Sequence, residues 1–195
     1  MNISVFCGAT LPANISFIET AAQLGHLIAK EGHTLLYGGS NLGLMGVVSS
    51  AALSDNGHVI GVIPSFFSEE IILSQPVTEL VRVASIAERK TYLITHSDAF
   101  IALPGGIGTM DEVFEVLVAN QLGRCGKPLG LLNTQGFYNK QVEMFQHMQD
   151  EGFYNYSEAR YLIVDEQPES LLQMLASYVP LRNENSVSRR LRPNA

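Results

Sequence analysis

Short apolar runs alternate with longer stretches of helical periodicity along most of the chain, and this rhythm constrains the fold more than any other feature. Short apolar runs between turn signals are typical of buried strands, whereas apolar residues three and four apart indicate amphipathic helices. The predicted strands span residues 3–7, 34–37, 58–63, 80–83, 99–103, 128–132 and 161–164. The predicted helices span residues 15–31, 44–55, 86–97, 109–122, 137–151 and 168–178. This alternation predicts an α/β fold, a parallel sheet with helices on both faces.

Length and charge limit the organisation of the chain. Its 195 residues, 46% of them hydrophobic, suffice for one substantial core, so we expect a single domain over residues 1–180. Residues 181–195 carry four arginines against one glutamate among Asn, Ser and Pro, which predicts a flexible basic tail. The alternative is a tail that binds an anionic partner. The formal charge of −7 argues against a nucleic-acid groove.

The composition gives no sign of secretion, membrane insertion or metal binding. Cys7 and Cys125 suggest neither a disulfide framework nor a metal-ligand cluster, and the five histidines lack metal-ligand spacing. The first residues lack the features of a secretory signal, and no later apolar run approaches membrane-spanning length. We therefore expect a soluble cytoplasmic protein with no metal and no membrane partner.

A glycine-rich turn joins the fifth predicted strand to the helix that follows it. Residues 103–112 read Leu-Pro-Gly-Gly-Ile-Gly-Thr-Met-Asp-Glu. Free backbone N–H groups and the positive end of the helix dipole converge at a helix start, and glycines let a phosphate approach the backbone closely. We predict that Gly105, Gly106, Gly108 and Thr109 bind a phosphate group.

Two known phosphate motifs do not fit this chain. The dinucleotide fingerprint needs a small residue where the glycine turn has Asp111, which argues against NAD. A second glycine cluster at residues 38–46 has the glycine spacing of a Walker A loop but places Leu44 where the lysine belongs. A nucleoside triphosphatase is therefore not expected, and a smaller phosphate ligand remains.

The second glycine cluster is nevertheless expected to face the ligand. In a doubly wound sheet, the loops at the carboxyl ends of the strands gather in one crevice. The 38–46 cluster, the 105–109 loop and the turn after the first strand all occupy such positions. We therefore place Gly39, Gly43 and Met45 among the substrate contacts.

Two carboxylates stand at the start of the helix after the glycine turn. Thr109 and Glu112 are three residues apart and share a helix face, whereas Asp111 is rotated from Glu112 by roughly 100°. A phosphate bound at Thr109 would place the next part of the ligand beside Glu112. Complementarity to the helix dipole is the explanation we favour for Asp111, and by position alone it is nearly as good an explanation for Glu112.

A charged triplet, Glu88-Arg89-Lys90, lies in the helix before the fifth strand. Taken alone, such a triplet usually forms a solvated helix face. If the helix begins at about Ser85, however, Arg89 or Lys90 comes close to the crevice.

Several motifs together resemble one family. Residues 104–112 match the PGGxGTxxE signature of the LOG (Lonely guy) proteins, often labelled lysine decarboxylase-like, and residues 88–90 match their ERK element. Further matches lie at residues 6–8, 37–39, 43–46, 61–64, 97–100, 121–123 and 127–133. The resemblance extends from the first predicted strand to at least Asn139.

The resemblance implies a Rossmann-like homodimer that hydrolyses the N-glycosidic bond of cytokinin riboside 5′-monophosphates or AMP, releasing the base and ribose 5-phosphate. By the same resemblance, Arg89 and Glu112 are the catalytic pair, and Lys90, Glu70 and residues 105–109 contact the substrate. No cofactor is expected, because no lysine lies in a recognisable pyridoxal context.

The residue types suit this reaction. Cleaving a ribosyl–base bond builds positive charge on the sugar, which a carboxylate such as Glu112 can stabilise while it orients or deprotonates water. Arg89 stays protonated near neutral pH, so it would position the phosphate or ribose, or hold Glu112 ionised. Two alternatives remain open: a broader nucleotide hydrolase for salvage, and a non-catalytic nucleotide-binding or carrier protein of the same fold.

Overall fold

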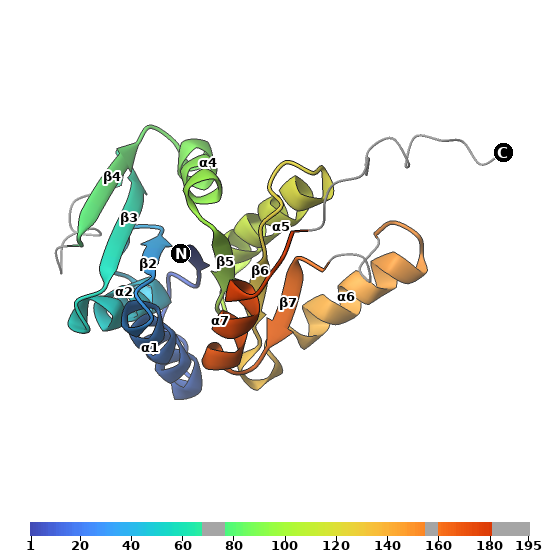
Figure 1. Ribbon diagram of the computed structural model, residues 1–195, viewed down its shortest axis with the longest axis horizontal. Coiled ribbons are helices and arrows are strands. Elements are labelled where there is room, and N and C mark those ends of the chain that lie inside the picture. The colour runs from blue at the N-terminus through green and yellow to red at the C-terminus, as the bar shows by residue number, and fades with distance from the viewer. Residues whose placement is uncertain (68–76, 155–159, 181–195) are drawn as a thin grey trace.

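The computed structural model describes residues 1–67, 77–154 and 160–180, which form an α/β domain of one sheet and its covering helices (Figure 1). The strands are β1 (Asn2–Phe6), β2 (Thr34–Tyr37), β3 (His58–Pro64), β4 (Glu79–Val83), β5 (Ala99–Ala102), β6 (Leu129–Leu132) and β7 (Leu162–Asp165). The helices are α1 (Ile15–Lys30), α2 (Gly43–Ser54), α4 (Ile86–His96), α5 (Ile107–Gln121), α6 (Asn139–Asp150) and α7 (Pro168–Ala176).

The described strands form one parallel sheet in the order β4-β3-β2-β1-β5-β6-β7. The chain begins in the middle with β1, builds outward to β4, and then returns to add β5, β6 and β7 on the other side. This is a Rossmann-like doubly wound sheet whose strand order reverses between β1 and β5. At that point the N–H of Gly8 donates to the carbonyl of Pro104 over 3.2 Å, which ties the two strand ends together.

Two cores sandwich the sheet, because successive side chains of each strand point to opposite faces. Ile3 and Val5 of β1 pack in the core beneath α1, α2 and α7. Phe6 points the other way, into the core beneath α4, α5 and α6, and stacks on Phe100 of β5 with ring centroids 5.9 Å apart. Burial on both sides explains why the central strands are almost continuously apolar.

The elements predicted from the periodicity are all present, with ends shifted by no more than two residues. Two of the larger shifts have a local cause. Helix α5 begins at Ile107 rather than Thr109, because Gly106 already serves as its N-cap. Helix α6 begins at Asn139 rather than Phe137, because residues Thr134–Gly136 form a separate 3-10 turn with Gln135 at a positive φ of 51°.

None of the helices in the described ranges is both long enough and apolar enough to cross a bilayer. The expected basic tail, residues 181–195, lies outside the described residues, and its flexibility stays a prediction.

Candidate active site

A cavity of about 620 Å³ opens at the carboxyl ends of the strands, at the point where the strand order reverses. Its walls come from residues 5–12 at and after the end of β1, from Gly38 and Ser40 after β2, and from residues 104–106, 108 and 109 after β5. The structure thus brings together the three glycine-containing segments that were expected to share one crevice. Crevices at this position are where ligands bind in open α/β sheets.

The amino end of α5 supplies the anion-binding part of the cavity. The first α5 amide bonded to a carbonyl of its own helix is that of Met110, which donates to Gly106 over 3.1 Å. The N–H groups of Ile107, Gly108 and Thr109 precede it and have no carbonyl within the helix to bond. They lie at the positive end of the helix dipole, so an oxyanion would be stabilised there.

Close packing explains why residue 105 is a glycine. A Cβ atom at Gly105 would overlap the hydroxyl of Thr109 and would lie 2.9 Å from the nitrogen of Gly8. Thr109 itself is buried, with 3% of its surface exposed, and lines the cavity. The Gly105 turn therefore lets two loops and the first turn of α5 meet around one small space.

Helix α4 begins just after Ser85, its N-cap, as predicted. The Ser85 hydroxyl accepts the N–H of Glu88 over 3.1 Å. The Glu88 carboxylate in turn accepts the N–H of Ala84 over 2.8 Å. This reciprocal arrangement is a variant of the capping box. It places Arg89 one turn inside α4, with its guanidinium directed over Gly38 and into the cavity.

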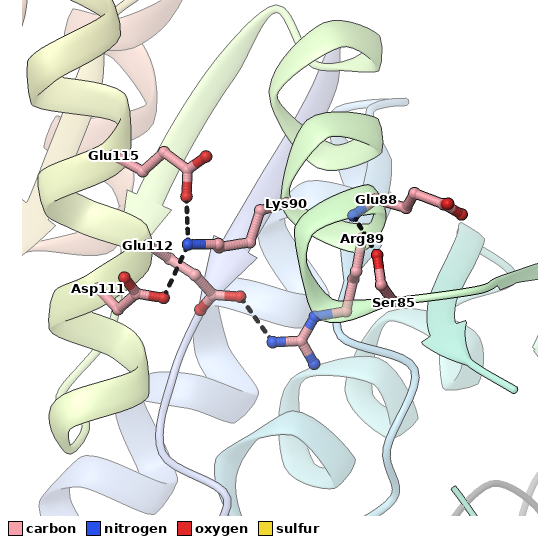
Figure 2. Close-up of polar contacts among 7 residues, drawn as sticks. All are labelled: Ser85, Glu88, Arg89, Lys90, Asp111, Glu112 and Glu115. Carbon is pink, nitrogen blue, oxygen red and sulfur yellow. Dashed lines mark hydrogen bonds and ion pairs between the residues drawn. The ribbon is translucent and has the colours of Figure 1, made fainter. Parts of the chain in front are cut away.

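Arg89 and Glu112 form an ion pair in the wall of the cavity (Figure 2). Arg89 Nη2 donates to Glu112 Oε1 over 3.1 Å, and the two side chains are 18% and 10% exposed. Arg89 Nε is buried and has no hydrogen-bond partner among the described residues. Buried donors left unpaired in this way are uncommon and occur where a ligand or water completes the bonding.

Burial sets the acidity of Glu112. Removal from water raises the pKa of the Glu112 carboxyl to about 7, because the charged form is poorly solvated. Arg89 and, more weakly, Lys90 oppose this rise, whereas the negative charges of Asp111 and Glu115 add to it. A carboxyl with a pKa near neutrality can both accept and release a proton at physiological pH, as general acid–base catalysis requires.

Lys90 lies behind this pair. Its ammonium contacts Asp111 Oδ2 at 3.0 Å and Glu115 Oε2 at 2.5 Å, joining α4 to α5 (Figure 2). Among the described residues, those that line the cavity do not include Lys90. Asp111, for which complementarity to the helix dipole is the predicted role, also pairs with Lys90.

The remaining predicted contacts differ in where they lie. Met45 lines the cavity, whereas Gly39 and Gly43 are not among the described residues that line it. Gly39 and Gly43 have positive φ angles of 75° and 57°, and a Cβ at Gly43 would overlap the backbone of Ala9 and Thr10. They shape the loops around the cavity. Glu70 lies outside the described residues.

Sequence reasoning missed the apolar part of the lining. Leu11, Phe17, Phe67 and Phe137 belong to it and lie in segments with no motif of their own, whereas Ile63 lies within the matched residues 61–64. Phe17 and Phe137 meet edge to face with centroids 5.8 Å apart. Position could have indicated some of them, because Leu11 and Phe67 lie shortly after the carboxyl ends of β1 and β3.

Cys7 also lines the cavity. Burial, with a smaller contribution from the charge of Glu112, raises the pKa of the Cys7 thiol, so the thiol stays neutral and unreactive. Within residues 1–67, 77–154 and 160–180, no group of three or more His, Cys, Asp or Glu side chains is arranged to hold a metal ion.

Comparison with known proteins places this geometry in a family. A family model described as "Possible lysine decarboxylase" matches residues 45–175, which include Arg89, Lys90 and the first turns of α5. Cytokinin riboside 5′-monophosphate phosphoribohydrolase LOG1 of Arabidopsis thaliana is 40% identical over 189 residues, which are 96% of this chain and 88% of that protein. The chain belongs to the LOG family. Arg89 and Glu112 therefore lie in the matched region of a LOG-family protein.

Solved structures extend the comparison beyond the LOG family. A molybdenum cofactor binding protein from Rippkaea orientalis superposes with a TM-score of 0.69 at 27% identity, over 90% of this chain and 95% of that one. The Moco carrier protein of Chlamydomonas reinhardtii gives a TM-score of 0.67 at 26% identity, over 91% and 98%. The fold is thus shared by proteins named as hydrolases and by proteins described as binders or carriers. The residues of the site, rather than the fold, must therefore distinguish hydrolysis from binding.

Proposed function

We propose that this protein hydrolyses the N-glycosidic bond of adenosine 5′-monophosphates, with or without an N6 substituent, and releases the free base and ribose 5-phosphate. The observation that carries the proposal is the buried Arg89–Glu112 pair, which lines the same cavity as the amide cradle at the start of α5. Glu112 is three residues beyond Thr109, about 4.5 Å further along the helix axis. A phosphate held at the helix start thereby leaves the ribose within reach of the carboxylate.

The cradle and the ion pair have separate tasks in the proposed reaction. The amides of residues 107–109 bind the phosphate, and this remote binding energy orients the bond to be broken. As the C1′–N bond lengthens, the Glu112 carboxylate stabilises the positive charge on the ribose. Water adds to C1′ and gives a proton to Glu112. The departing base takes up a proton from solvent, and Glu112 then releases its proton to solvent. Arg89 stays protonated and holds Glu112 in its ionised form.

The apolar wall supports an aromatic leaving base. Phe17, Phe67 and Phe137 offer flat apolar surfaces on which a purine can stack, and Leu11 and Met45 add aliphatic area. Such a wall also accommodates an apolar N6 substituent on the base. The relative LOG1 is named for a cytokinin riboside 5′-monophosphate. We therefore propose adenine or cytokinin as the released base.

A base-release assay tests the proposal. The purified protein is incubated with AMP, N6-prenylated AMP, GMP and CMP, and the free base is measured chromatographically. We expect release from the two adenine nucleotides and little from CMP. Release from every nucleotide would instead indicate a salvage hydrolase. Nucleotide binding without release would indicate a carrier, the function that the similarity to the cofactor-binding and carrier structures favours.

We further propose that the protein acts in the cytoplasm as a homodimer on a free small-molecule substrate, without a cofactor, nucleic acid or membrane partner. The half-exposed side chains of Val118 and Leu122, at and just after the carboxyl end of α5, support association. Light scattering after size exclusion should give twice the chain mass of 21.3 kDa, and a mass equal to one chain would contradict this assembly.

A further inference from the structure

The Lys90 ammonium is enclosed by the two carboxylates that flank Glu112 along α5. Asp111 precedes Glu112 directly, and Glu115 follows it by nearly one turn, so the three acids occupy one short stretch of the helix. Lys90 contacts Asp111 at 3.0 Å and Glu115 at 2.5 Å, and only 18% of its side chain is exposed (Figure 2). The positive charge of Lys90 is therefore already balanced by carboxylates of the protein.

The Glu112 side chain has different surroundings on its two sides. On one side it lines the main cavity together with Arg89. On the other side it packs with Phe6, Lys90, Ile94 and Glu115 around a gap too small to hold a water molecule. Among the described residues, those that line both spaces are Glu112 and Phe6. Lys90 thus faces Glu112 from the side away from the main cavity.

We propose that Lys90 is a positioning residue for Glu112, which it keeps as a free carboxylate turned toward Arg89 and the cavity by neutralising Asp111 and Glu115. The inference rests on the proposed function, because it assigns Glu112 the reacting carboxylate. It departs from the substrate contact that family resemblance implied for Lys90.

The charges around Glu112 explain why the positive charge of Lys90 is needed. With Lys90 absent, Asp111, Glu112 and Glu115 would place three negative charges near the single guanidinium of Arg89. Like charges nearby disfavour ionisation, especially for a group that is already poorly solvated. Another titratable group that interacts with Glu112 is Cys7, just after β1, whose neutral thiol supplies no compensating charge. Loss of Lys90 should therefore raise the pKa of Glu112 above its value of about 7.

The variant Lys90→Met removes the charge and keeps most of the apolar stem, whereas Lys90→Arg keeps the charge. For Lys90→Met we expect the pH at which kcat reaches half its maximum to rise by about one unit, and kcat near pH 6.5 to fall about tenfold. KM for AMP should stay within about twofold of the original, and Lys90→Arg should resemble the unmodified protein. Lys140→Met, which removes an ion-paired lysine on α6, controls for net charge and should move nothing.

A readout independent of turnover separates this inference from the proposed function. The carboxyl carbon of Glu112 is titrated by ¹³C NMR and identified by the signal lost in Glu112→Gln. The midpoint should be higher in Lys90→Met than in the unmodified protein, even if no nucleotide is hydrolysed. Glu115→Gln, which removes a negative charge, should lower the midpoint and serves as the test if Lys90→Met does not fold.

Two results would overturn the inference. A raised KM with an unmoved pH profile would make Lys90 a substrate contact. An unmoved Glu112 midpoint in both Lys90→Met and Glu115→Gln would reduce the contacts of Lys90 to a structural link between α4 and α5.

Discussion

The first turn of α5 and the turn that follows it handle charge by different means. The first turn presents backbone N–H groups beside Gly106 and Gly108 and carries no ionisable side chain. The next turn carries Asp111, Glu112 and Glu115, all matched to Arg89 and Lys90 of α4. The amide site therefore binds its anion without titrating, whereas the side-chain site depends on pH. Binding and chemistry can thus be separated by mutation although they are about one helical turn apart.

The largest expected effect comes from Glu112→Gln, which removes the carboxylate and leaves the amide cradle intact. We expect kcat for base release to fall by about 10³-fold, within the range measured for loss of a general acid or base. The dissociation constant for AMP should change by less than about threefold. Steady-state kinetics and calorimetric titration measure the two quantities. A loss of affinity equal to the loss of rate would show that Glu112 serves binding as much as chemistry.

Gly105→Ala should disturb the amide site at the start of α5 and leave the carboxylates unchanged. The new methyl group meets the Thr109 hydroxyl and the Gly8 backbone, so the loops around the cradle must move apart. We expect KM for AMP to rise about tenfold or more while the Glu112 midpoint stays near 7. Adenosine, which has no phosphate, is the internal control, because its slow hydrolysis should be much less affected. Equal losses for AMP and adenosine would mean that residue 105 has no specific connection to the phosphate.

The raised pKa of Glu112 also predicts a pH-dependent stability difference. An acid whose pKa is higher in the folded protein than its ordinary value of 4.5 binds its proton more tightly when folded, so its ionisation destabilises the fold. This cost is absent below about pH 4.5 and complete above about pH 7. Glu112→Gln should therefore match the unmodified protein in stability at pH 4 and exceed it by about 2 to 3 kcal/mol at pH 8.

Urea unfolding at several pH values measures this difference. Glu143→Gln changes the same charge on the exposed side of α6 and serves as the control. A stability gain of Glu112→Gln that is equal at pH 4 and pH 8 would contradict the raised pKa.

The smallest effect is expected at the start of α4. Ser85→Ala removes the side-chain cap that accepts the Glu88 amide, which should lower the free energy of unfolding by about 1 kcal/mol. Because Arg89 is still carried by the same helix, kcat/KM should fall by no more than about fivefold. Ser177→Ala at the end of α7 removes a hydroxyl far from α4 and gives the reference value. A loss of activity as large as that of Glu112→Gln would show that the cap itself orients the ion pair.

The same contrast explains what could be predicted from the sequence. The elements and the cradle depend on local patterns, namely apolar periodicity and a glycine turn between a strand and a helix, and these are visible in one chain. The start of α4 at Ser85 could likewise be anticipated, and with it the approach of Arg89 to the cavity.

The details that depend on tertiary packing could not be predicted. The pairing of Lys90 with Asp111 and Glu115 requires the relative rotation of two helices that are separated in the chain by β5. The aromatic contact of Phe17 with Phe137 joins segments far apart in sequence. Whether Gly39 faces the cavity or only shapes a loop depends on its backbone angles rather than on its presence in a glycine cluster.

A crystal structure of Glu112→Gln with AMP would locate the phosphate and the ribose in the cavity, because the variant should bind the nucleotide without cleaving it. We expect phosphate oxygens within hydrogen-bonding distance of the amides of residues 107–109 and the side chain of residue 112 beside C1′ of the ribose. A nucleotide bound with its phosphate away from the start of α5, or with C1′ remote from residue 112, would contradict this binding mode.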